Sequence, residues 1–392
     1  MTILLPLSSI PAIRLVDGAD ERIYRIRRIL LWRTLRSLSG VEPVRVWIGP
    51  MGGREGGVDR YIRTLVANSA HRFKTSKEFP MLLWGLRWVG RTIPVAGRLY
   101  GEYLHRARGI EVAHVHRSAT YAEAFKQTEA RLPWLYTLHG IGFEEHWRHR
   151  PDVVRWIREA KELALQSVRL APLATVVSRW LKEWVEERTG TTVTVTPPGV
   201  DFREVDSVGS SEFLEWSGQQ PGFLLWVGRL AFEKRLDWFI ELAERLPERR
   251  FVALADSSAS RFREKYWTRI PSNFRYYGRV PRPLVVSAFH ACSVHVNTSL
   301  YDAAPTTLVE AMACGKAVVA SDNVGAREIQ DESGACFLFD TQSLADLEER
   351  TRAALNHPEV GARGLAFAKE KRDWAKLVGF FDRQYEALAR RS

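Results

Sequence analysis

The feature that most constrains the fold is a repeated alternation of short apolar runs with amphipathic stretches, which begins near residue 44 and continues along the chain. The apolar runs are rich in β-branched residues, as buried parallel strands are. Amphipathic helical patterns lie between them, for example at residues 234–246 and 283–293. Such β-α-β repeats predict an α/β fold of two doubly wound, Rossmann-like parallel sheets that face a cleft. The expected strands are residues 44–49, 111–116, 134–140 and 174–178 in the first sheet, and 223–230, 250–256, 273–278, 294–299, 317–322 and 335–340 in the second.

The length of the chain and its turn residues predict where the domains divide. A chain of 392 residues suits two domains of ordinary size. Pro197, Pro198 and Gly199 stiffen and turn the segment between the two strand series, so we expect the link there. The expected parts are a basic extension at 1–43, a first domain at 44–198, a second domain at 199–372 and a terminal helix at 373–392.

Positive charge is concentrated in the first half of the chain. Residues 1–200 hold 31 Lys and Arg against 19 Asp and Glu, whereas residues 201–392 hold 26 against 27. A basic surface attracts an anionic membrane, nucleic acid or a phosphorylated substrate, or serves only solubility. No apolar run reaches the ~18 residues expected of a spanning helix, and the N-terminus does not resemble a signal peptide. Three separated cysteines indicate a reducing, cytoplasmic environment and argue against a zinc site.

Two basic, apolar segments of the first half leave two interpretations open. Residues 21–38 place six arginines among apolar residues of helical spacing, together with Trp32. Residues 79–104 form a second apolar, aromatic and basic piece. Peripheral binding at the inner face of an anionic membrane is one interpretation. Packing of both segments on the first sheet is the other.

The carboxyl ends of the strands are where a ligand is expected in doubly wound folds. "VGRLAFEKR" places Gly228 and Arg229 at such an end, with Lys234 five residues after the arginine. A guanidinium, an ammonium group and free backbone amides at a strand-to-helix turn form a phosphate clamp. Arg and Lys are also common in loops that bind nothing, so this segment alone does not decide the function.

The stretch "YDAAPTTLVEAMACG" places two acids around the start of a helix. Pro305 suits the first helical turn and Gly315 its end. Asp302 and Glu310 are eight positions apart, which at helical rise separates them by about 10 Å. This is too far for shared-proton chemistry and for a retaining glycosidase pair, whose carboxyls lie about 5 Å apart. It suits one ligand with hydroxyls at both ends and a phosphate bridge between them. An N-capping Asp with an exposed Glu is the structural alternative.

Two further strand ends carry candidate residues. Gly52 and Gly53 belong to a glycine-rich loop after the first strand, which lacks the G-x-G-x-x-G pattern and so disfavours a nicotinamide cofactor. His139 ends a strand of the first series, and His114 and His116 flank another.

The chain contains no D-x-D, no P-loop and no G-x-S-x-G motif. A basic clamp in place of a metal ion would suit a diphosphate leaving group.

Taken together in order and spacing, these segments resemble the retaining glycosyltransferases of family 4, which have the two-domain GT-B fold. The resemblance covers residue 44 to the C-terminus. "VTPPGVD" is similar to the interdomain "PNGVD" of the family, and "VGRLAFEKR" to its diphosphate clamp. "SLYDAAPTTLVEAMACGKAVVASDNVGAREI" is similar to its long E-x7-E signature, with Asp302 in place of the first Glu.

The resemblance implies a role for each matching residue. Arg229 and Lys234 would hold the donor diphosphate, Glu310 the ribose, and Asp302 and His139 the transferred sugar. The other implied contacts are the backbone of Gly228, Ala303, Ala304, Pro305 and Thr306 at the sugar and phosphates, Val280 beside the base, and Gly52 and Gly53 near the phosphate and the acceptor. The terminal helix would pack back on the first domain.

The implied activity is retaining, metal-independent transfer of a hexosyl or N-acetylhexosaminyl group from a UDP- or GDP-sugar to a hydroxyl of a glycan or lipid-linked acceptor, as in polysaccharide biosynthesis. No cofactor beyond the nucleotide sugar is implied. Asp302 is one methylene shorter than the usual Glu, so its sugar contact must differ. An epimerase or phosphorylase of similar fold and a non-catalytic sugar-nucleotide binder stay open. A nucleic-acid partner is disfavoured, because no RRM, KH or zinc-finger signature is present.

Overall fold

The computed structural model describes residues 42–49, 56–75, 102–116, 122, 125–126, 132–257, 262, 266 and 270–390. The chain divides into two compact units, Met1–Pro43 and Val44–Ser392, and both sheets belong to the second unit. The expected amphipathic helix at 21–38, Gly52, Gly53 and nearly all of the segment 79–104 lie outside the described residues.

Within the described residues, the first sheet has six parallel strands in the order β2-β1-β3-β4-β5-β6. The strands are β1 (Arg45–Gly49), β2 (Arg72–Thr75), β3 (Val112–His116), β4 (Trp134–Leu138), β5 (Ala174–Val176) and β6 (Thr194–Val195). The accompanying helices are α2 (Gly57–Asn68), η3 (Tyr103–Ala107), η4 (Glu144–Trp147), α6 (Pro151–Leu170) and α7 (Arg179–Thr189). The strand order reverses between β1 and β3, so the carboxyl ends of these two strands flank a switch point.

The second sheet, again within the described residues, has six parallel strands in the order β12-β11-β10-β7-β8-β9. Its strands are β7 (Leu224–Gly228), β8 (Phe251–Ala255), β9 (Phe274–Tyr277), β10 (Val294–Asn297), β11 (Ala317–Ser321) and β12 (Cys336–Phe339). Its helices are α9 (Ser211–Ser217), η5 (Phe232–Lys234), α10 (Leu236–Arg245), α12 (Arg282–Ala291), α13 (Thr306–Ala313), α14 (Val324–Ser333), α15 (Leu344–Asn356) and α16 (Val360–Lys371). The switch point here lies between β7 and β10.

The expected pair of doubly wound parallel sheets is therefore confirmed. Buried strands read almost continuously apolar, as Val46 and Ile48 of β1 and Val318 and Val319 of β11 illustrate, because helices cover both faces of each sheet. The short edge strands β2 and β6 were not among the expected ones. The sequence RFKT of β2 is largely exposed, so it lacks the apolar run that marks an inner strand.

The chain passes between the two domains at two places that lie side by side. The first is the link, which ends in α8 (Phe202–Val205), and the second joins α16 to α17 (Trp374–Ala389). Val200 and Asp373 form a parallel bridge between these two passages: the Val200 N–H donates to the carbonyl of Arg372 at 2.7 Å and the Trp374 N–H to that of Val200 at 3.0 Å.

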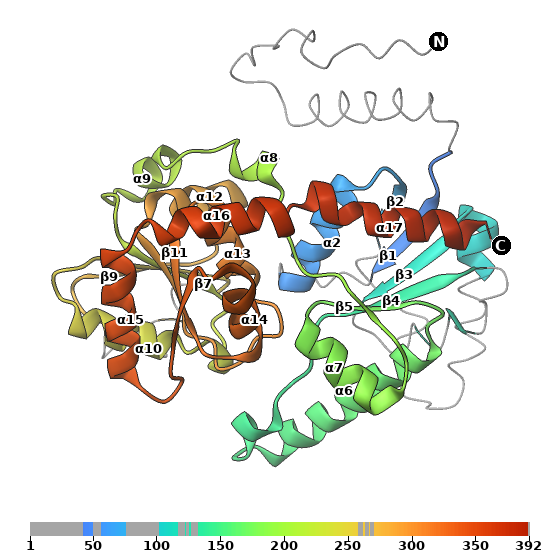
Figure 1. The fold of residues 1–392 in the computed structure, drawn as a ribbon, viewed down its shortest axis with the longest axis horizontal. Helices are drawn as coiled ribbons and strands as arrows, with labels where there is room; N and C mark the ends of the chain where they lie inside the picture. Colours follow the sequence, from blue (N-terminus) through green and yellow to red (C-terminus); the bar gives the residue numbers. More distant parts are fainter. Residues whose placement is uncertain are drawn as a thin grey trace, which may run out of the picture. The chain divides into compact units, whose positions relative to one another are not determined.

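The last helix, α17, packs on the first domain (Figure 1). Trp374, Phe381 and Tyr385 are buried in the same apolar cluster as β1, β3 and α2. The Tyr385 hydroxyl also lies 2.7 Å from Nδ1 of His114, which is fully buried in β3. The C-terminal helix therefore completes the core of the first domain although its sequence follows the second.

Candidate functional site

A lysine–aspartate pair lies at the switch point of the second sheet. Lys234 ends η5 after β7, and Asp302 lies in the loop between β10 and α13. The Lys234 ammonium donates to Oδ2 of Asp302 at 2.8 Å and to Oγ of Ser299 at 3.3 Å. Both charged side chains are largely buried, with 18% and 23% of their surfaces exposed. The two expected site segments are thus in direct contact at the strand ends where a ligand binds in such folds.

Backbone contacts hold the loop that carries Asp302. Its Oδ1 accepts the N–H of Ala304 at 3.2 Å, and its carbonyl accepts the N–H of Gly325 at 3.0 Å. Asn323 donates from Nδ2 to the carbonyl of Ser299 at 2.9 Å. A Cβ atom on Gly325 would lie 2.5 Å from the Asp302 carbonyl oxygen, so only glycine allows this close approach. The loop is therefore anchored to the start of α14.

Helix α13 begins directly after Pro305 and places its N-terminus at this loop. The Leu308 N–H donates to the carbonyl of Pro305 at 3.2 Å. The amides of Thr306 and Thr307 come before the first bond of the helix, and this positive end favours an anion. Ala303 and Pro305 are buried, and Ala304 and Thr306 are half-buried. Gly315 adopts a left-handed φ of 70° directly after the helix, as its predicted role as a stop requires. The short side chains leave the backbone open to close approach by a ligand.

The other predicted donor-binding residues around this turn and near α12 are placed differently. The guanidinium of Arg229 donates to Oε1 of Glu233 at 2.7 Å, and its side chain is 55% exposed. Arg229 therefore lies on the surface side of the turn, whereas Lys234 lies on the inner side. Gly228 ends β7, where a Cβ atom would lie 2.8 Å from the ring of Trp226. Val280 is half-buried and packs on the core of the second domain next to α12.

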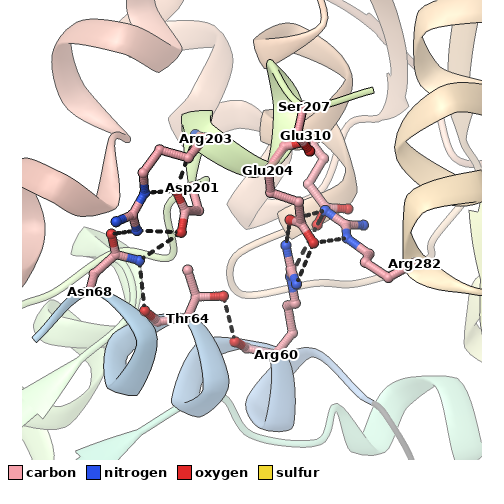
Figure 2. Close-up of polar contacts among 9 residues, drawn as sticks. All are labelled: Arg60, Thr64, Asn68, Asp201, Arg203, Glu204, Ser207, Arg282 and Glu310. Carbon is pink, nitrogen blue, oxygen red and sulfur yellow. Dashed lines mark hydrogen bonds and ion pairs between the residues drawn. The ribbon is translucent and has the colours of Figure 1, made fainter. Parts of the chain in front are cut away.

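Glu310 is part of a charged cluster at the domain junction, which consists of Arg60, Glu204, Arg282 and Glu310 (Figure 2). Oε1 of Glu310 lies 2.7 Å from Nη2 of Arg282 and 3.8 Å from Nε of Arg60. Glu204 pairs with both arginines, at 3.3 Å from Nε of Arg282 and 3.2 Å from Nη1 of Arg60. Burial alone would raise the pKa of Glu204, but Arg282 and Arg60 hold that pKa below its usual range.

The strand end that carries the predicted histidine lies against the Asp302 loop from the first domain. Nε2 of His139 is 2.7 Å from Nδ1 of His116, and its ring contacts that of Tyr61 edge-on at 4.8 Å. A Cβ atom on Gly140 would lie 3.5 Å from that of Ala303, and the ring of Phe143 is 4.9 Å from that of Tyr301. The strand end "HGIGF" of the first domain thus faces "YDAAP" of the second.

A small, partly open hollow lies between the domains beside this loop. It is lined by Ser178, Pro197 and Pro198 from the first domain and the link, and by Ala303, Ala304 and Pro305 from the second.

His114 does not belong to the site, because it is fully buried under α17 and bonded to Thr137 at 2.7 Å. Burial lowers the pKa of His114 well below its usual value, so it is neutral at pH 7.

The structure brings together Lys234, Asp302 and the His139 strand end, and it places Glu310 in a separate charged cluster. Sequence reasoning did not single out Arg60, Glu204 or Arg282, which surround Glu310. Arg282 follows Pro281 directly at the start of α12, which is the one local signal that could have marked it.

Among the described residues, no group of three or more His, Cys, Asp or Glu side chains is arranged to hold a metal ion. None of the described helices combines the length and the apolar character needed to cross a bilayer.

Comparison with known families and proteins identifies both domains. A family model described as Glycosyltransferase Family 4 matches residues 57–204, and one described as Glycosyl transferases group 1 matches residues 215–372. The chain is 28% identical over 227 residues to phosphatidyl-myo-inositol mannosyltransferase of Mycobacterium tuberculosis, covering 54% of this chain and 59% of that protein. It is 28% identical over 168 residues to a sulfoquinovosyl transferase of Arabidopsis thaliana, covering 41% of this chain and 32% of that protein. The chain therefore spans less than two thirds of the length of these relatives.

Solved structures share the architecture at low sequence identity. Sucrose-phosphate synthase of Thermosynechococcus elongatus superposes with a TM-score of 0.72 over 90% of this chain and 100% of that one, at 16% identity. HepE of Anabaena, in complex with UDP and glucose, superposes with a TM-score of 0.66 over 88% of this chain and 100% of that one, at 17% identity. At these identities the likeness concerns the fold.

Proposed function

Because the chain belongs to glycosyltransferase family 4 and has its two-domain GT-B fold, we propose that it transfers a sugar from a nucleotide-diphosphate sugar to an acceptor hydroxyl with retention of configuration. The observation that carries the proposal is the contact of Lys234 with Asp302 at 2.8 Å at the switch point of the second sheet. There a cation, a carboxylate and the N-terminus of α13 converge on the position where a doubly wound sheet binds its ligand.

In this proposal the donor diphosphate binds between Lys234 and the first turn of α13. The ammonium group would be shared between Asp302 and a phosphate oxygen, and the amide of Thr306 in the first turn of α13 would face the phosphates. Arg229, at the surface side of the same turn, would add a second cation. Glu310 would accept the ribose hydroxyls, and the half-buried Val280 would lie beside the base. UDP or GDP is the proposed nucleotide, and the structure of the Anabaena relative with UDP and glucose supports a donor of this class.

The reaction would break the bond between the anomeric carbon and the oxygen of the diphosphate. Lys234 and the α13 amides would stabilise the negative charge that develops on the leaving oxygen. The acceptor hydroxyl would attack the same face of the sugar and pass its proton to the leaving phosphate. Asp302 is engaged by Lys234 and by the N–H of Ala304, so we assign it to holding the sugar and not to covalent catalysis. His139 would contact the sugar from the first domain. No cofactor and no metal ion take part in this scheme.

A glycan or a lipid-linked molecule is the proposed acceptor, on the side of the first domain. The phosphatidyl-myo-inositol mannosyltransferase of Mycobacterium tuberculosis supports a lipid-linked acceptor by its name. The excess of Lys and Arg in residues 1–200 also suits an anionic surface. We therefore propose peripheral contact with the cytoplasmic face of a membrane and no nucleic-acid partner.

Thermal denaturation with UDP-, GDP- and ADP-sugars tests the proposal. A donor that binds only the folded chain raises the melting temperature with its concentration. The K371A variant, which removes an exposed lysine of the second domain, serves as a control and should show the same increase in melting temperature as the wild type. If no nucleotide sugar shifts the transition, the proposed donor class is wrong. If D302A leaves turnover unchanged, Asp302 has no role in transfer. If a donor binds but the wild type transfers no sugar, the chain is better described as a sugar-nucleotide binder.

A further inference from the structure

The charged cluster around Glu310 draws its members from both domains and from the link between them (Figure 2). Arg60 lies on α2 of the first domain, Glu204 on α8 of the link, and Arg282 and Glu310 on α12 and α13 of the second. Neighbouring contacts reinforce this junction, since Asn68 of α2 donates from Nδ2 to Oδ2 of Asp201 at 3.1 Å. The proposed ribose ligand therefore lies at a meeting point of the two domains.

Glu310 requires these cations because of its burial. Only 10% of its side-chain surface is exposed, against 29% for Arg60, 26% for Glu204 and 23% for Arg282. An ionised carboxylate removed from water is costly unless it is paired and hydrogen-bonded. Arg282 supplies the close pair at 2.7 Å, and Arg60 a second cation at 3.8 Å. Two arginines and two glutamates balance their charges within this cluster.

Both arginines approach the same oxygen of Glu310. The 2.7 Å and 3.8 Å contacts are made to Oε1. A carboxylate offers about four lone-pair sites on its two oxygens, so Oε2 can accept a ribose hydroxyl while Arg282 stays in place. Arg282 also contacts Glu204 at 3.3 Å, which fixes the direction of its guanidinium. The geometry thus orients the carboxylate without using up its capacity as an acceptor.

We propose that Arg282 and Arg60 are positioning residues for the ribose of the donor: Arg282 orients Glu310 from within the second domain, and Arg60 completes the arrangement from the first domain. The ribose site is then complete only while the two domains are in contact. This inference rests on the proposed function, in which Glu310 binds the ribose. It predicts that a residue of the domain opposite the donor contributes to recognition of the nucleotide.

A purely structural ion pair between the domains would behave differently. Its loss would change stability or would weaken every nucleotide equally. A positioning role makes the loss specific to nucleotides that carry ribose hydroxyls. The experiment therefore compares each ribonucleotide with its 2′,3′-dideoxy form, and the ratio of the two dissociation constants is the readout.

Binding of UDP, GDP and ADP is measured by isothermal titration calorimetry, and the nucleotide that binds most tightly is then compared with its dideoxy form. The variants are E310Q, R60A and R282K, with R63A as the control, because Arg63 is an exposed arginine on the same helix α2. We expect R60A and R282K each to weaken the ribonucleotide about tenfold, on the scale of one charged hydrogen bond, and to leave the dideoxy form unchanged. R63A should bind both forms as the wild type does. Combining R60A with E310Q should add little to E310Q alone.

The outcomes separate this inference from the proposed function. If no nucleotide binds, or if E310Q leaves the ribose preference intact, the donor assignment fails and the inference fails with it. If E310Q abolishes the preference while R60A and R282K retain it, the inference alone is overturned. Thermal denaturation of each variant checks folding, and the partly exposed Arg60 keeps the test valid even if R282K does not fold.

Discussion

The carboxylate of Glu328, on α14 of the second domain, accepts the backbone N–H of Arg179, which begins α7 of the first domain. The two oxygens lie 3.0 and 2.9 Å from this nitrogen, and one of them also accepts the N–H of Trp180 at 3.3 Å. Glu328 thus caps a helix of the other domain, where the positive end of the helix dipole favours an anion. Its side chain is 10% exposed, so the bonds are shielded from water.

The first prediction is that E328A destabilises the chain. The substitution leaves the amides of Arg179 and Trp180 unpaired, at a cost of about 1–3 kcal/mol in the free energy of unfolding. Urea denaturation measures this loss. The D331A variant removes an exposed acid from the same helix α14 and should change the unfolding free energy little. Equal midpoints for the two variants would show that the capping contact contributes nothing.

The second prediction is that K234A suppresses transfer. Lys234 carries the positive charge nearest to Asp302, and removal of one preorganised charge at a leaving group lowers turnover by about 10²- to 10³-fold. The assay uses the nucleotide sugar that stabilises the wild type most and follows release of the nucleotide diphosphate. K371A, which removes an exposed lysine, should retain full activity. Wild-type turnover by K234A would exclude this lysine from the chemistry.

The third prediction concerns the close contact at Gly325. In G325A the new Cβ atom would lie 2.5 Å from the Asp302 carbonyl oxygen and 2.7 Å from Cδ of Pro305, so the Asp302 loop must shift. Overpacking of this kind costs about 1–3 kcal/mol, and displacement of Asp302 should lower activity as well. G209A is the control, because a Cβ atom there approaches only Glu212, at 3.9 Å. An unchanged unfolding free energy and activity in G325A would mean that the Asp302 loop can shift at no cost.

The fourth prediction is a loss of stability in mild acid. Burial lowers the pKa of His295 to about 4, and it lowers that of His114 well below the usual value. Unfolded histidines take up protons near pH 6.5 while these two stay neutral in the folded chain, so their contribution is present above pH 6.5 and is lost as the pH falls toward 4. Protonation of His295 in the unfolded chain should reduce the unfolding free energy by about 1 kcal/mol between pH 7.5 and 5.5, and His114 should act in the same direction.

Urea denaturation at these two pH values tests the fourth prediction. H295Q should lose less stability than the wild type on acidification, since it removes one of the two buried groups. H357Q replaces an exposed histidine and should keep the wild-type dependence on pH. A wild-type dependence in H295Q would show that burial of His295 is not the cause.

The inner strands, and the proximity of Lys234 and Asp302 at their ends, were predictable from the sequence, whereas the edge strands and the contacts between domains were not. Phe251–Ala255 and Ala317–Ser321 are almost wholly apolar because both sheet faces are covered, so their composition marks them. The edge strand Arg72–Thr75 is exposed and polar, and nothing in its composition separates it from a loop. The rule that ligands lie at strand ends predicted that the segments of Lys234 and Asp302 are neighbours, but it gave no distance between the two side chains.

The partners of Glu310 could not be found in this way. Arg60 lies on an amphipathic helix, where an isolated arginine looks like one more solvent-facing charge. Its position beside Glu204 and Glu310 depends on how the two domains meet, and this is not encoded in any local pattern. Pairings between residues of different domains are set by tertiary packing, which periodicity within one segment does not report.

The parallel bridge of Val200 with Asp373 has a mechanical consequence. Both passages of the chain between the domains are tied together at one place, where the backbone leaves no room for a Cβ atom on Gly199, which would lie 2.4 Å from the Arg372 carbonyl oxygen. Two chain passages paired at one bridge resist sliding of one domain past the other. They still permit rotation of the domains about that bridge. We therefore expect any relative motion of the two domains to be a rotation about residues 199–200 and 372–373.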